Sequence, residues 1–323
     1  MKVYSEIIKN FSKQFEWQPE IVRLEAKLPS GFLGVKKLVI VGMGGSGLVG
    51  GLLKIFKPDL DIIIHRDYGL LALSDLNERL VILNSYSGDT EEVLDSFDKT
   101  LKMSLRAAVI STGGKLIELA KSHSIPFIQL PNVGLQPRMA LGHQIKALLE
   151  IIGDKEGLKQ ASELANLLNP QDCENAGKNL AQKLKDFIPV IYSSARNSAV
   201  AYAWKIKFNE TSKIPAFCNV FPELNHNEMN GFTNKNLSRN FYFIFLKDDE
   251  DNPRIQKRME TTAKLFKEKN LPIEVLELND KNIFHKIFSS LILADWTSYY
   301  LAEEYGVDPE QTPLIEEFKK IIQ

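Results

Sequence analysis

The stretch NSYSGDTEEVL, residues 84–94, joins a strand-like run to a helix-like segment. The apolar run LVIL precedes it, acids at helical spacing follow it, and Ser85, Ser87 and Thr90 flank Gly88 in between. Free amides and the positive end of a helix dipole favour an anion at such a junction, and small hydroxyls complete the anion's hydrogen bonds. The stretch therefore predicts an anion site. The alternative is that Ser87 and Thr90 are only turn and N-cap residues.

A second junction, GMGGSG at residues 42–47, follows the apolar run LVIV. It matches G-x-G-x-x-G, which is typical of dinucleotide-binding folds, but the ribose-binding acid would be Asp67, which lies late and poorly placed. The glycines could also serve only a tight turn. A triphosphate site would need Gly-Lys-Ser/Thr and a magnesium ligand, and neither is found. Because Ser46 adds a hydroxyl beside exposed amides, we expect the two junctions to bind the phosphate monoester of a small metabolite.

Short, continuously apolar strands alternate with helical patterns along the chain. This alternation predicts parallel sheets covered by helices on both faces, and so an α/β fold with two similar halves. The expected strands are residues 38–41, 62–64, 80–83, 107–110, 127–130, 188–192, 241–246 and 273–278. The expected helices include residues 47–56, 90–99, 115–123, 198–212, 254–269, 283–304 and 312–322.

The ends of the two halves are less sharply marked. Residues 4–27 show the apolar spacing of one or two amphipathic helices. A helical stretch, residues 141–168, ends at an Asn-Pro pair that we take as the region joining the halves. We expect three segments: a helical segment at residues 1–30, a phosphate-binding subdomain at residues 31–155, and a second subdomain with the C-terminal helices at residues 156–323.

Composition excludes several classes of function. The net charge of −1 argues against a nucleic-acid-binding protein. No apolar run is long enough to span a bilayer, and the N-terminus lacks the apolar core of a signal peptide. Two cysteines make a disulfide framework unlikely and favour the cytoplasm. The five histidines are scattered, with no metal-binding pair, so we expect neither a metal nor a cofactor.

Strand, Gly-Gly-Ser-Gly, helix, then strand, Ser-x-Ser-Gly-x-Thr, helix, resembles the sugar isomerase (SIS) domain. Three further segments resemble the bifunctional phosphoglucose/phosphomannose isomerase family, and the resemblance extends over nearly the whole chain. They are PNVGLQPRMALGH at residues 131–143, NETSKIPAFCNVFPELNHNEMNGF at residues 209–232, and GVDPEQTPLIEEFKKII at residues 306–322. The chain departs from the family at Gly51, at Gln136 and at His143. None of these departures removes a group that the chemistry needs.

The resemblance implies a metal-independent isomerase that interconverts glucose 6-phosphate and mannose 6-phosphate with fructose 6-phosphate through a cis-enediolate. A non-catalytic SIS-type sugar-phosphate sensor is the alternative, and a nicotinamide dehydrogenase lacks its ribose acid. The implied enzyme is a cytoplasmic homodimer without a cofactor. The phosphate would be bound by Gly45, Ser46, Ser85, Ser87 and Thr90.

The same resemblance implies a catalytic role for five residues. Glu210 would carry the proton, and His226 would open the sugar ring across the dimer interface. Arg138 would stabilise the enediolate, Lys319 would contact the ring oxygen or a hydroxyl, and Thr312 would help the site to accept both epimers at C2. From the residues alone four of them have a structural alternative: a solvated glutamate, a structural histidine, a surface or ion-pair arginine, and a helix N-cap for Thr312.

On the predicted helices, side-chain spacing adds detail. Ala199, Ala203, Ile206 and Glu210 line one helix face, so that a carboxylate ends an apolar row. The last helix has one apolar stripe with Lys320 almost opposite it, and Lys319 at its edge.

Overall fold

The computed structural model describes residues 2–22, 34–280 and 282–322, and these divide into two compact units. The N-terminal unit comprises Phe11–Leu168, and the C-terminal unit comprises Met1–Asn10 with Asn169–Gln323. The chain therefore passes between the units after Leu168. Its first residues belong to the C-terminal unit, so the compact units differ from the three segments that we expected.

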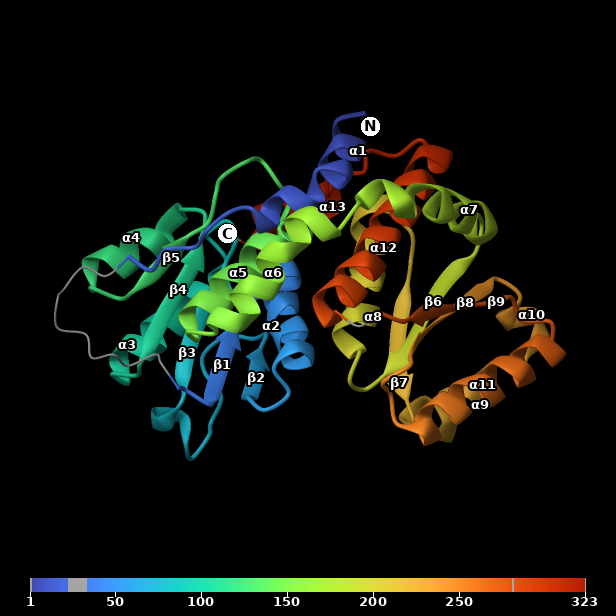
Figure 1. Ribbon diagram of the computed structural model, residues 1–323, viewed down its shortest axis with the longest axis horizontal. Helices are drawn as coiled ribbons and strands as arrows, with labels where there is room; N and C mark the ends of the chain where they lie inside the picture. The colour runs from blue at the N-terminus through green and yellow to red at the C-terminus, as the bar shows by residue number, and fades with distance from the viewer. Residues whose placement is uncertain (1, 23–33, 281, 323) are drawn as a thin grey trace. The chain divides into compact units, whose positions relative to one another are not determined.

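The N-terminal unit is built on a five-stranded sheet in the order β2-β1-β3-β4-β5, with every neighbouring pair parallel (Figure 1). Its strands are β1 (Lys37–Val41), β2 (Asp61–His65), β3 (Leu80–Asn84), β4 (Ala107–Ser111) and β5 (Phe127–Gln129). Its helices are η1 (Phe11–Phe15), α2 (Gly44–Phe56), η2 (Leu76–Glu78), α3 (Glu91–Lys102), α4 (Gly114–Ser122), η3 (Pro137–Met139), α5 (Leu141–Ile151) and α6 (Lys155–Leu167). Each strand lies within one or two residues of its predicted place.

Both faces of this sheet are covered, which explains why its strands are apolar without alternation. On one face Val39, Val81 and Val109 pack with α3 and α4 in a single cluster. On the other face α2 and α5 contact the strands. Burying each such side chain contributes about 1.5–3 kcal/mol to folding. The predicted sandwich of helices around a parallel sheet is confirmed.

The C-terminal unit has a four-stranded parallel sheet in the order β7-β6-β8-β9. Its strands are β6 (Ile188–Ser194), β7 (Phe217–Phe221), β8 (Phe241–Asp248) and β9 (Ile273–Leu278). Its helices are α1 (Lys2–Lys9), η4 (Pro170–Cys173), α7 (Glu174–Leu184), α8 (Ser198–Lys207), η5 (Phe208–Ser212), η6 (Glu223–His226), α9 (Glu228–Gly231), α10 (Lys235–Ser238), α11 (Pro253–Glu268), α12 (Ile283–Tyr305) and α13 (Pro313–Ile322). An aromatic cluster under α11 fills one face of the sheet, and α8 and α12 contact the other.

Several predicted helices are shorter than the pattern suggested. Helix α1 ends at Lys9, η1 is a 3₁₀ helix, and residues 16–22 are not helical, whereas the predicted helix from residue 23 onward lies outside the described residues. The stretch 141–168 is two helices, because Gly153 has a φ of +70° and Asp154 caps α6. Strand β7 and helix α7 were not predicted.

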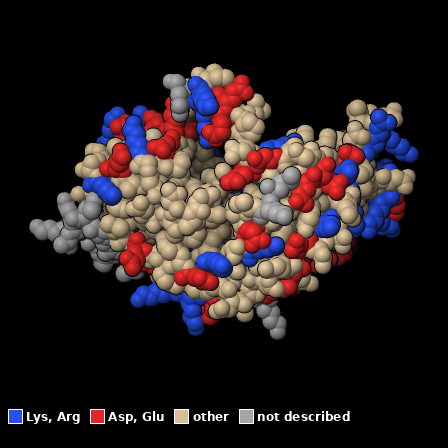
Figure 2. Space-filling model, turned by 90° about the horizontal axis from the view of Figure 1, so that it is seen from above, with Lys and Arg blue, Asp and Glu red and all other residues tan. Residues whose placement is uncertain are grey.

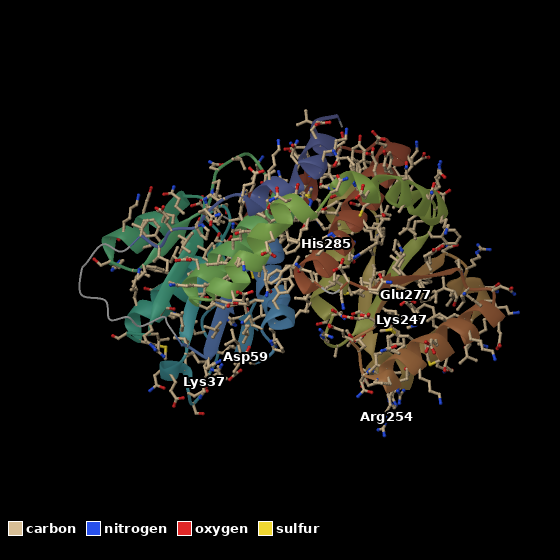
Figure 3. All side chains as sticks on the ribbon, in the orientation of Figure 1. Lys37, Asp59, Lys247, Arg254, Glu277 and His285 are labelled. Carbon is tan, nitrogen blue, oxygen red and sulfur yellow. The ribbon has the colours of Figure 1, made fainter. Side chains whose placement is uncertain are left out.

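Charges distinguish the two edges of the N-terminal sheet. At its amino edge Lys37, labelled in Figure 3, forms ion pairs with Asp75 and Glu78 at 3.0 and 2.6 Å. Lys36 pairs in the same way with Asp59 at 2.7 Å. These cations already have carboxylate partners, whereas the carboxyl edge carries the hydroxyls and glycines of the two predicted junctions.

Figure 2 shows groups of both charges around a broad area without charged side chains. None of the described helices combines the length and apolar character needed to cross a membrane.

Candidate active site

The two predicted junctions lie side by side at the carboxyl edge of the N-terminal sheet. Strands β1 and β3 are neighbours, with Leu38 opposite Leu80 and Val41 opposite Leu83. The connection from β1 leads to β2 on one side, and β3 and β4 follow on the other, so the strand order reverses between β1 and β3. Ligands of open parallel sheets bind in the crevice at such a switch point.

Glycine is required where β1 turns into α2. Gly44 has a φ of +48°. A Cβ on Gly45 would lie 2.8 Å from the carbonyl of Pro137 and 2.9 Å from the backbone nitrogen of Arg138. The structure thus brings two predicted site residues, Gly45 and Arg138, into direct backbone proximity. Met43, at the N-cap of α2, provides no side-chain cap, so the first amides of this helix are available to an anion.

The loop after β3 is shaped by its hydroxyls and by one glycine. The Ser85 Oγ accepts the Gly88 N–H at 3.0 Å and lies 2.8 Å from the Thr90 Oγ1. Gly88 has a φ of +86°, and a Cβ there would lie 1.9 Å from the Gly113 carbonyl oxygen. Thr90 occupies the N-cap position of α3, but its side chain makes no capping hydrogen bond. The cap interpretation of Thr90 therefore holds for its position and not for its hydroxyl.

Hydrogen bonds connect the two junctions. The Tyr86 N–H donates to the Ser46 Oγ at 3.0 Å, and the Asn84 side-chain amide donates to the Ser46 carbonyl at 2.9 Å. The same Asn84 amide donates to Gln144 at 3.1 Å, and Gln144 donates to the Pro137 carbonyl at 3.1 Å. Asn84 and Gln144 thus link both junctions to the turn that carries Arg138. Sequence reasoning missed this pair.

Arg138 is 2% exposed, on the short helix η3 directly before α5. A surface position, the simplest interpretation of an arginine after proline, is therefore wrong. Burial of a permanent cation is costly unless other groups stabilise it, so protein groups must surround Arg138, and its role at the enediolate stays a prediction.

Helix α5 also carries a buried histidine close to this turn. His143 is 6% exposed, its ring meets Trp17 edge-on at 5.5 Å, and its Nδ1 has no hydrogen-bond partner among the described residues. Burial, with a smaller contribution from Lys146, lowers the pKa of His143 to about 4.

We predict that this histidine makes the fold sensitive to acid. Its pKa is lower in the folded chain than in the unfolded chain, so the unfolded chain binds more protons below about pH 6.5. The free energy of unfolding should fall by about 2 kcal/mol between pH 7 and pH 5 on account of His143 alone. Urea unfolding at both pH values would measure it. A His143→Phe variant should lose this part of the pH dependence, and the same dependence in the variant would contradict the assignment.

The carboxyl edge of the C-terminal sheet is chemically different. Lys286, which is 4% exposed, contacts Asp248 at 2.9 Å and Asp249 at 3.1 Å. Asn197 also donates to Asp248, at 2.9 Å. Carboxylates that already balance the buried cation occupy this edge, and a phosphate would meet like charge there. The arrangement favours the N-terminal unit for phosphate binding.

Glu210 lies on a π-helical turn, η5, that continues α8. The predicted helix over residues 198–212 is confirmed in extent, but its last turn has i→i+5 geometry, which is rare and frequent at functional sites. The turn is held on several sides. The Tyr4 hydroxyl lies 3.0 Å from the Thr211 Oγ1, and Ser212 donates to the Ser298 carbonyl at 2.8 Å. Glu210 itself is half-buried.

One turn before Glu210, Lys207 forms an ion pair with Asp295 of α12, and both side chains are almost completely buried. This pair fixes the start of the π turn against α12.

His226 is exposed and ends the short helix η6, just after the cis Phe221-Pro222 bond. Glu228 holds this loop to the sheet, because its carboxylate accepts hydrogen bonds from Tyr192 of β6 and Asn219 of β7. Burial and then the Glu228 carboxylate raise the pKa of the Tyr192 hydroxyl, which stays protonated as the donor. His226 therefore lies on a loop that Glu228 fixes to the sheet.

Thr312 directly precedes α13, and Lys319 lies in the second half of this helix. The Thr312 carbonyl accepts the Glu316 N–H at 3.0 Å, and the Lys319 ammonium lies 3.2 Å from the Glu316 carboxylate. The apolar stripe predicted for this helix is present and exposed. It consists of Leu314, Ile315, Phe318, Ile321 and Ile322. The contact of Lys319 with the ring oxygen or a hydroxyl stays a prediction.

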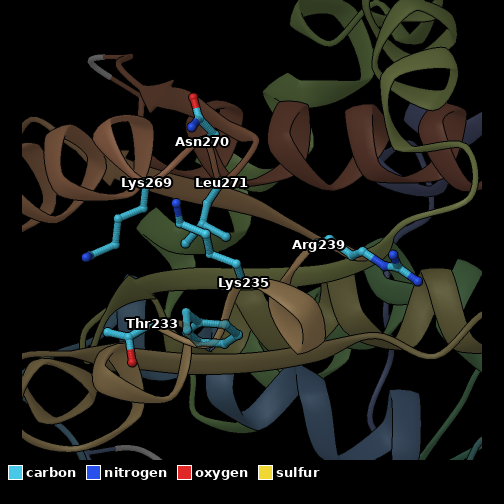
Figure 4. A pocket seen from close by; sticks show the side chains of 7 residues that line it. Thr233, Lys235, Arg239, Lys269, Asn270 and Leu271 are labelled. Atoms are coloured by element: carbon cyan, nitrogen blue, oxygen red, sulfur yellow. The ribbon is translucent and has the colours of Figure 1, made fainter.

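A surface hollow of about 210 Å³ lies elsewhere in the C-terminal unit, lined in part by Lys235, Arg239 and Lys269 (Figure 4). It lies where the chain enters β8 and β9, at the amino edge of the sheet. Figure 4 shows the ends of Lys269 and Arg239 pointing in opposite directions, so their charges do not converge on one anion. None of the predicted site residues lines it.

Comparison with known proteins agrees with the fold described above. The fold is similar to the solved C-terminal domain of glucosamine-fructose-6-phosphate aminotransferase from Francisella tularensis, with a TM-score of 0.69, 17% identity, and 96% of this chain and 97% of that chain covered. A family model described as the bacterial phospho-glucose isomerase C-terminal SIS domain matches residues 173–322. The two parallel-sheet units therefore define an α/β protein of the SIS type.

Two relatives narrow the assignment. The chain is 32% identical to a bifunctional phosphoglucose/phosphomannose isomerase of Aquifex aeolicus, with 99% of this chain and 98% of the relative covered. It is 36% identical to one of Caldicellulosiruptor bescii, with 88% and 89% covered. The chain belongs to the bifunctional phosphoglucose/phosphomannose isomerase family.

Proposed function

We propose that the chain is an aldose–ketose isomerase that interconverts glucose 6-phosphate and mannose 6-phosphate with fructose 6-phosphate, without a metal. One observation carries the proposal. A chain of this family has hydroxyls and glycines suited to a phosphate at the two junctions of the N-terminal sheet, the phosphate cradle, and a carboxylate, Glu210, on a π turn held by hydrogen bonds. A sugar-phosphate sensor would need the cradle but not Glu210, His226 and Lys319. The relatives' names also favour catalysis over sensing.

The N-terminal unit supplies the phosphate-binding groups in this proposal. The uncapped amides of α2 and α3, with Ser46, Ser85, Ser87 and Thr90, suit a phosphate monoester, which accepts many hydrogen bonds and is stabilised by helix N-termini. No described residue group offers the lysine-containing loop of a triphosphate site.

The chemistry moves two protons. His226 of the neighbouring subunit opens the ring, and Lys319 contacts the ring oxygen or a hydroxyl. The Glu210 carboxylate takes the proton from C2 and returns it to C1, while the hydroxyl proton passes from O2 to O1. Arg138 stabilises the negative charge of the cis-enediolate between these steps.

The enediolate is planar at C2, so the same intermediate leads to either C2 epimer. Glucose 6-phosphate and mannose 6-phosphate differ only there, and one set of residues can therefore serve both substrates. Thr312, at the start of α13, is assigned to accommodating both epimers.

We also propose a homodimer that works in the cytoplasm. Both cysteines, Cys173 and Cys218, are free thiols, which suits a reducing compartment. The dimer is proposed because His226 is assigned to the neighbouring subunit's site.

A coupled assay with both hexose 6-phosphates, with and without excess chelator, tests the proposed function. We expect activity on both substrates and no loss with the chelator. Within the described parts of the chain, no group of three or more His, Cys, Asp and Glu side chains could hold a metal ion. Activity that disappears with the chelator and returns with zinc would contradict a metal-independent reaction.

Ser87 allows a separate test of phosphate binding. It is exposed, and its Oγ accepts only the Asp89 N–H, at 3.3 Å, among the described contacts, so its removal should disturb the loop little. A hydrogen bond to a charged group is worth about 1.5–3 kcal/mol. We therefore expect Ser87→Ala to lower the affinity for a phosphorylated inhibitor roughly 10- to 150-fold, as measured by calorimetry. Ser122→Ala, at an exposed serine of α4, is the control. Unchanged affinity in a Ser85→Ala/Ser87→Ala double variant would refute this position for the phosphate.

A further inference from the structure

Lys213 ends the π turn that carries Glu210, in a conformation that is rare for lysine. Its backbone is left-handed, with φ of 57° and ψ of 35°. Residues other than Gly, Asn and Asp seldom adopt this region, and they persist there where surrounding contacts determine the backbone. The half-buried side chain turns back over the turn that it ends.

The Lys213 ammonium donates to three backbone carbonyls. The acceptors are Glu210 at 2.5 Å, Thr211 at 3.3 Å and Asp308 at 2.7 Å. An ammonium has three N–H donors, and carbonyls at the end of a helix lack partners within the helix. The first two contacts therefore satisfy the end of the π turn, whereas the third reaches a segment far away in the sequence.

That segment leads directly to α13. Helix α12 ends at Tyr305, and Gly306 caps it with a φ of +64°. The Asp308 carboxylate then accepts the backbone N–H groups of Glu310 at 2.8 Å and Gln311 at 3.4 Å, and the first of these hydrogen bonds is the main cause of the lowered pKa of Asp308. Asp308 thus shapes the chain just before Thr312.

We infer that Lys213 is a positioning residue for the reaction, because one ammonium ties the backbone of Glu210 to the segment that carries Thr312 and Lys319. The inference rests on the proposed function. Contacts of Thr211 and Ser212 hold the π turn to α1 and α12, whereas Lys213 contacts the Glu210 carbonyl itself. A displacement of about 1 Å at a reacting group can cost roughly 100-fold in rate, so the tether matters to the proton carrier.

Three substitutions separate the ammonium from the backbone conformation. Lys213→Met removes the charge and keeps most of the stem. Lys213→Gly removes the side chain and makes the left-handed backbone easy. Lys213→Arg restores a cation with several donors. Lys205→Met is the control, because Lys205 is a half-buried lysine of α8 whose ammonium lies over the Tyr202 ring.

Steady-state kinetics with fructose 6-phosphate, circular dichroism and thermal unfolding provide the test. We expect the Met and Gly variants to lose roughly 10- to 100-fold in kcat, with KM little changed because the phosphate cradle is in the other unit. The Arg variant should retain more activity than either, and Lys205→Met should match the wild type. The Gly variant keeps the test valid if the Met variant does not fold.

Wild-type kcat in a folded Met or Gly variant would overturn the inference, and so would a loss confined to KM. Glu210→Gln, measured alongside, distinguishes a failure of the inference about Lys213 from a failure of the proposal on which it rests. An inactive Glu210→Gln with a fully active Lys213→Met leaves the proposed function intact and refutes only the tether. An active Glu210→Gln refutes the role of Glu210 as proton carrier, whereas a wild-type protein without isomerase activity refutes the proposed function itself.

Discussion

Replacing Glu210 by glutamine should lower kcat by at least about 100-fold, because general-base catalysis typically contributes about 10²–10⁴-fold. Glutamine keeps the shape and much of the hydrogen bonding of glutamate but cannot accept the proton from C2. The π turn should remain folded, since the buried Lys207–Asp295 pair and the Thr211 and Ser212 contacts do not involve the Glu210 carboxylate. Binding of fructose 6-phosphate should change little.

Exchange of the C2 hydrogen with solvent deuterium gives an independent measurement, and it should decrease in parallel with isomerisation. Lys320→Ala is the matched control, because Lys320 is an exposed residue of α13 without a proposed role. A Glu210→Gln variant that retained more than about a tenth of wild-type turnover would be too active for the loss of a base. Glu210 would then be a structural residue.

The sheets could be predicted from the sequence because their strands are buried on both faces. A fully buried parallel strand is apolar at every position, as in Leu80–Leu83, and short runs of this kind stand out between helices. Strand β7 could not be found in this way. It lies at the edge of its sheet, Phe217 is exposed, and three of its five residues are only half-buried. Its sequence therefore lacks both alternation and a continuous apolar run.

The sequence did not predict helix ends correctly where contacts in the folded chain override the apolar spacing. Phe11 and Phe15 have the spacing of an α-helix and are buried, yet they lie on a 3₁₀ helix. The π turn at Glu210 is held by partners as distant as Tyr4 and Ser298, and a regular 3.6-residue repeat cannot indicate such an insertion. Tertiary hydrogen bonds, rather than propensity, hold the π turn.

The same reason explains which site residues were missed. Hydroxyls and glycines at strand–helix junctions have a local signature, so Ser46, Ser85 and Gly88 could be proposed from the sequence. Asn84, Gln144 and Lys213 act through partners 38 to 95 residues away. An asparagine directly after an apolar strand was the one available signal, and only the fold shows which residues it connects.

Mixing two inactive variants should restore activity if His226 serves the neighbouring subunit. In a two-fold symmetric dimer of one Glu210→Gln chain and one His226→Ala chain, one site loses both groups and the other regains both. Random exchange of equal amounts makes half of the dimers mixed, so about a quarter of the wild-type sites should return.

Each variant alone should have at most about 1% of wild-type activity if its residue contributes as a general acid or base. Subunit exchange is verified by native mass spectrometry, and a mixture of Lys320→Ala with one inactive variant, in which about half of the sites keep both groups, is the control. His226 is exposed, on a loop held by Glu228, and this position is compatible with a role in the neighbouring subunit's site. Activity that stays at the level of the separate variants, despite demonstrated exchange, would mean that each site takes both residues from one chain.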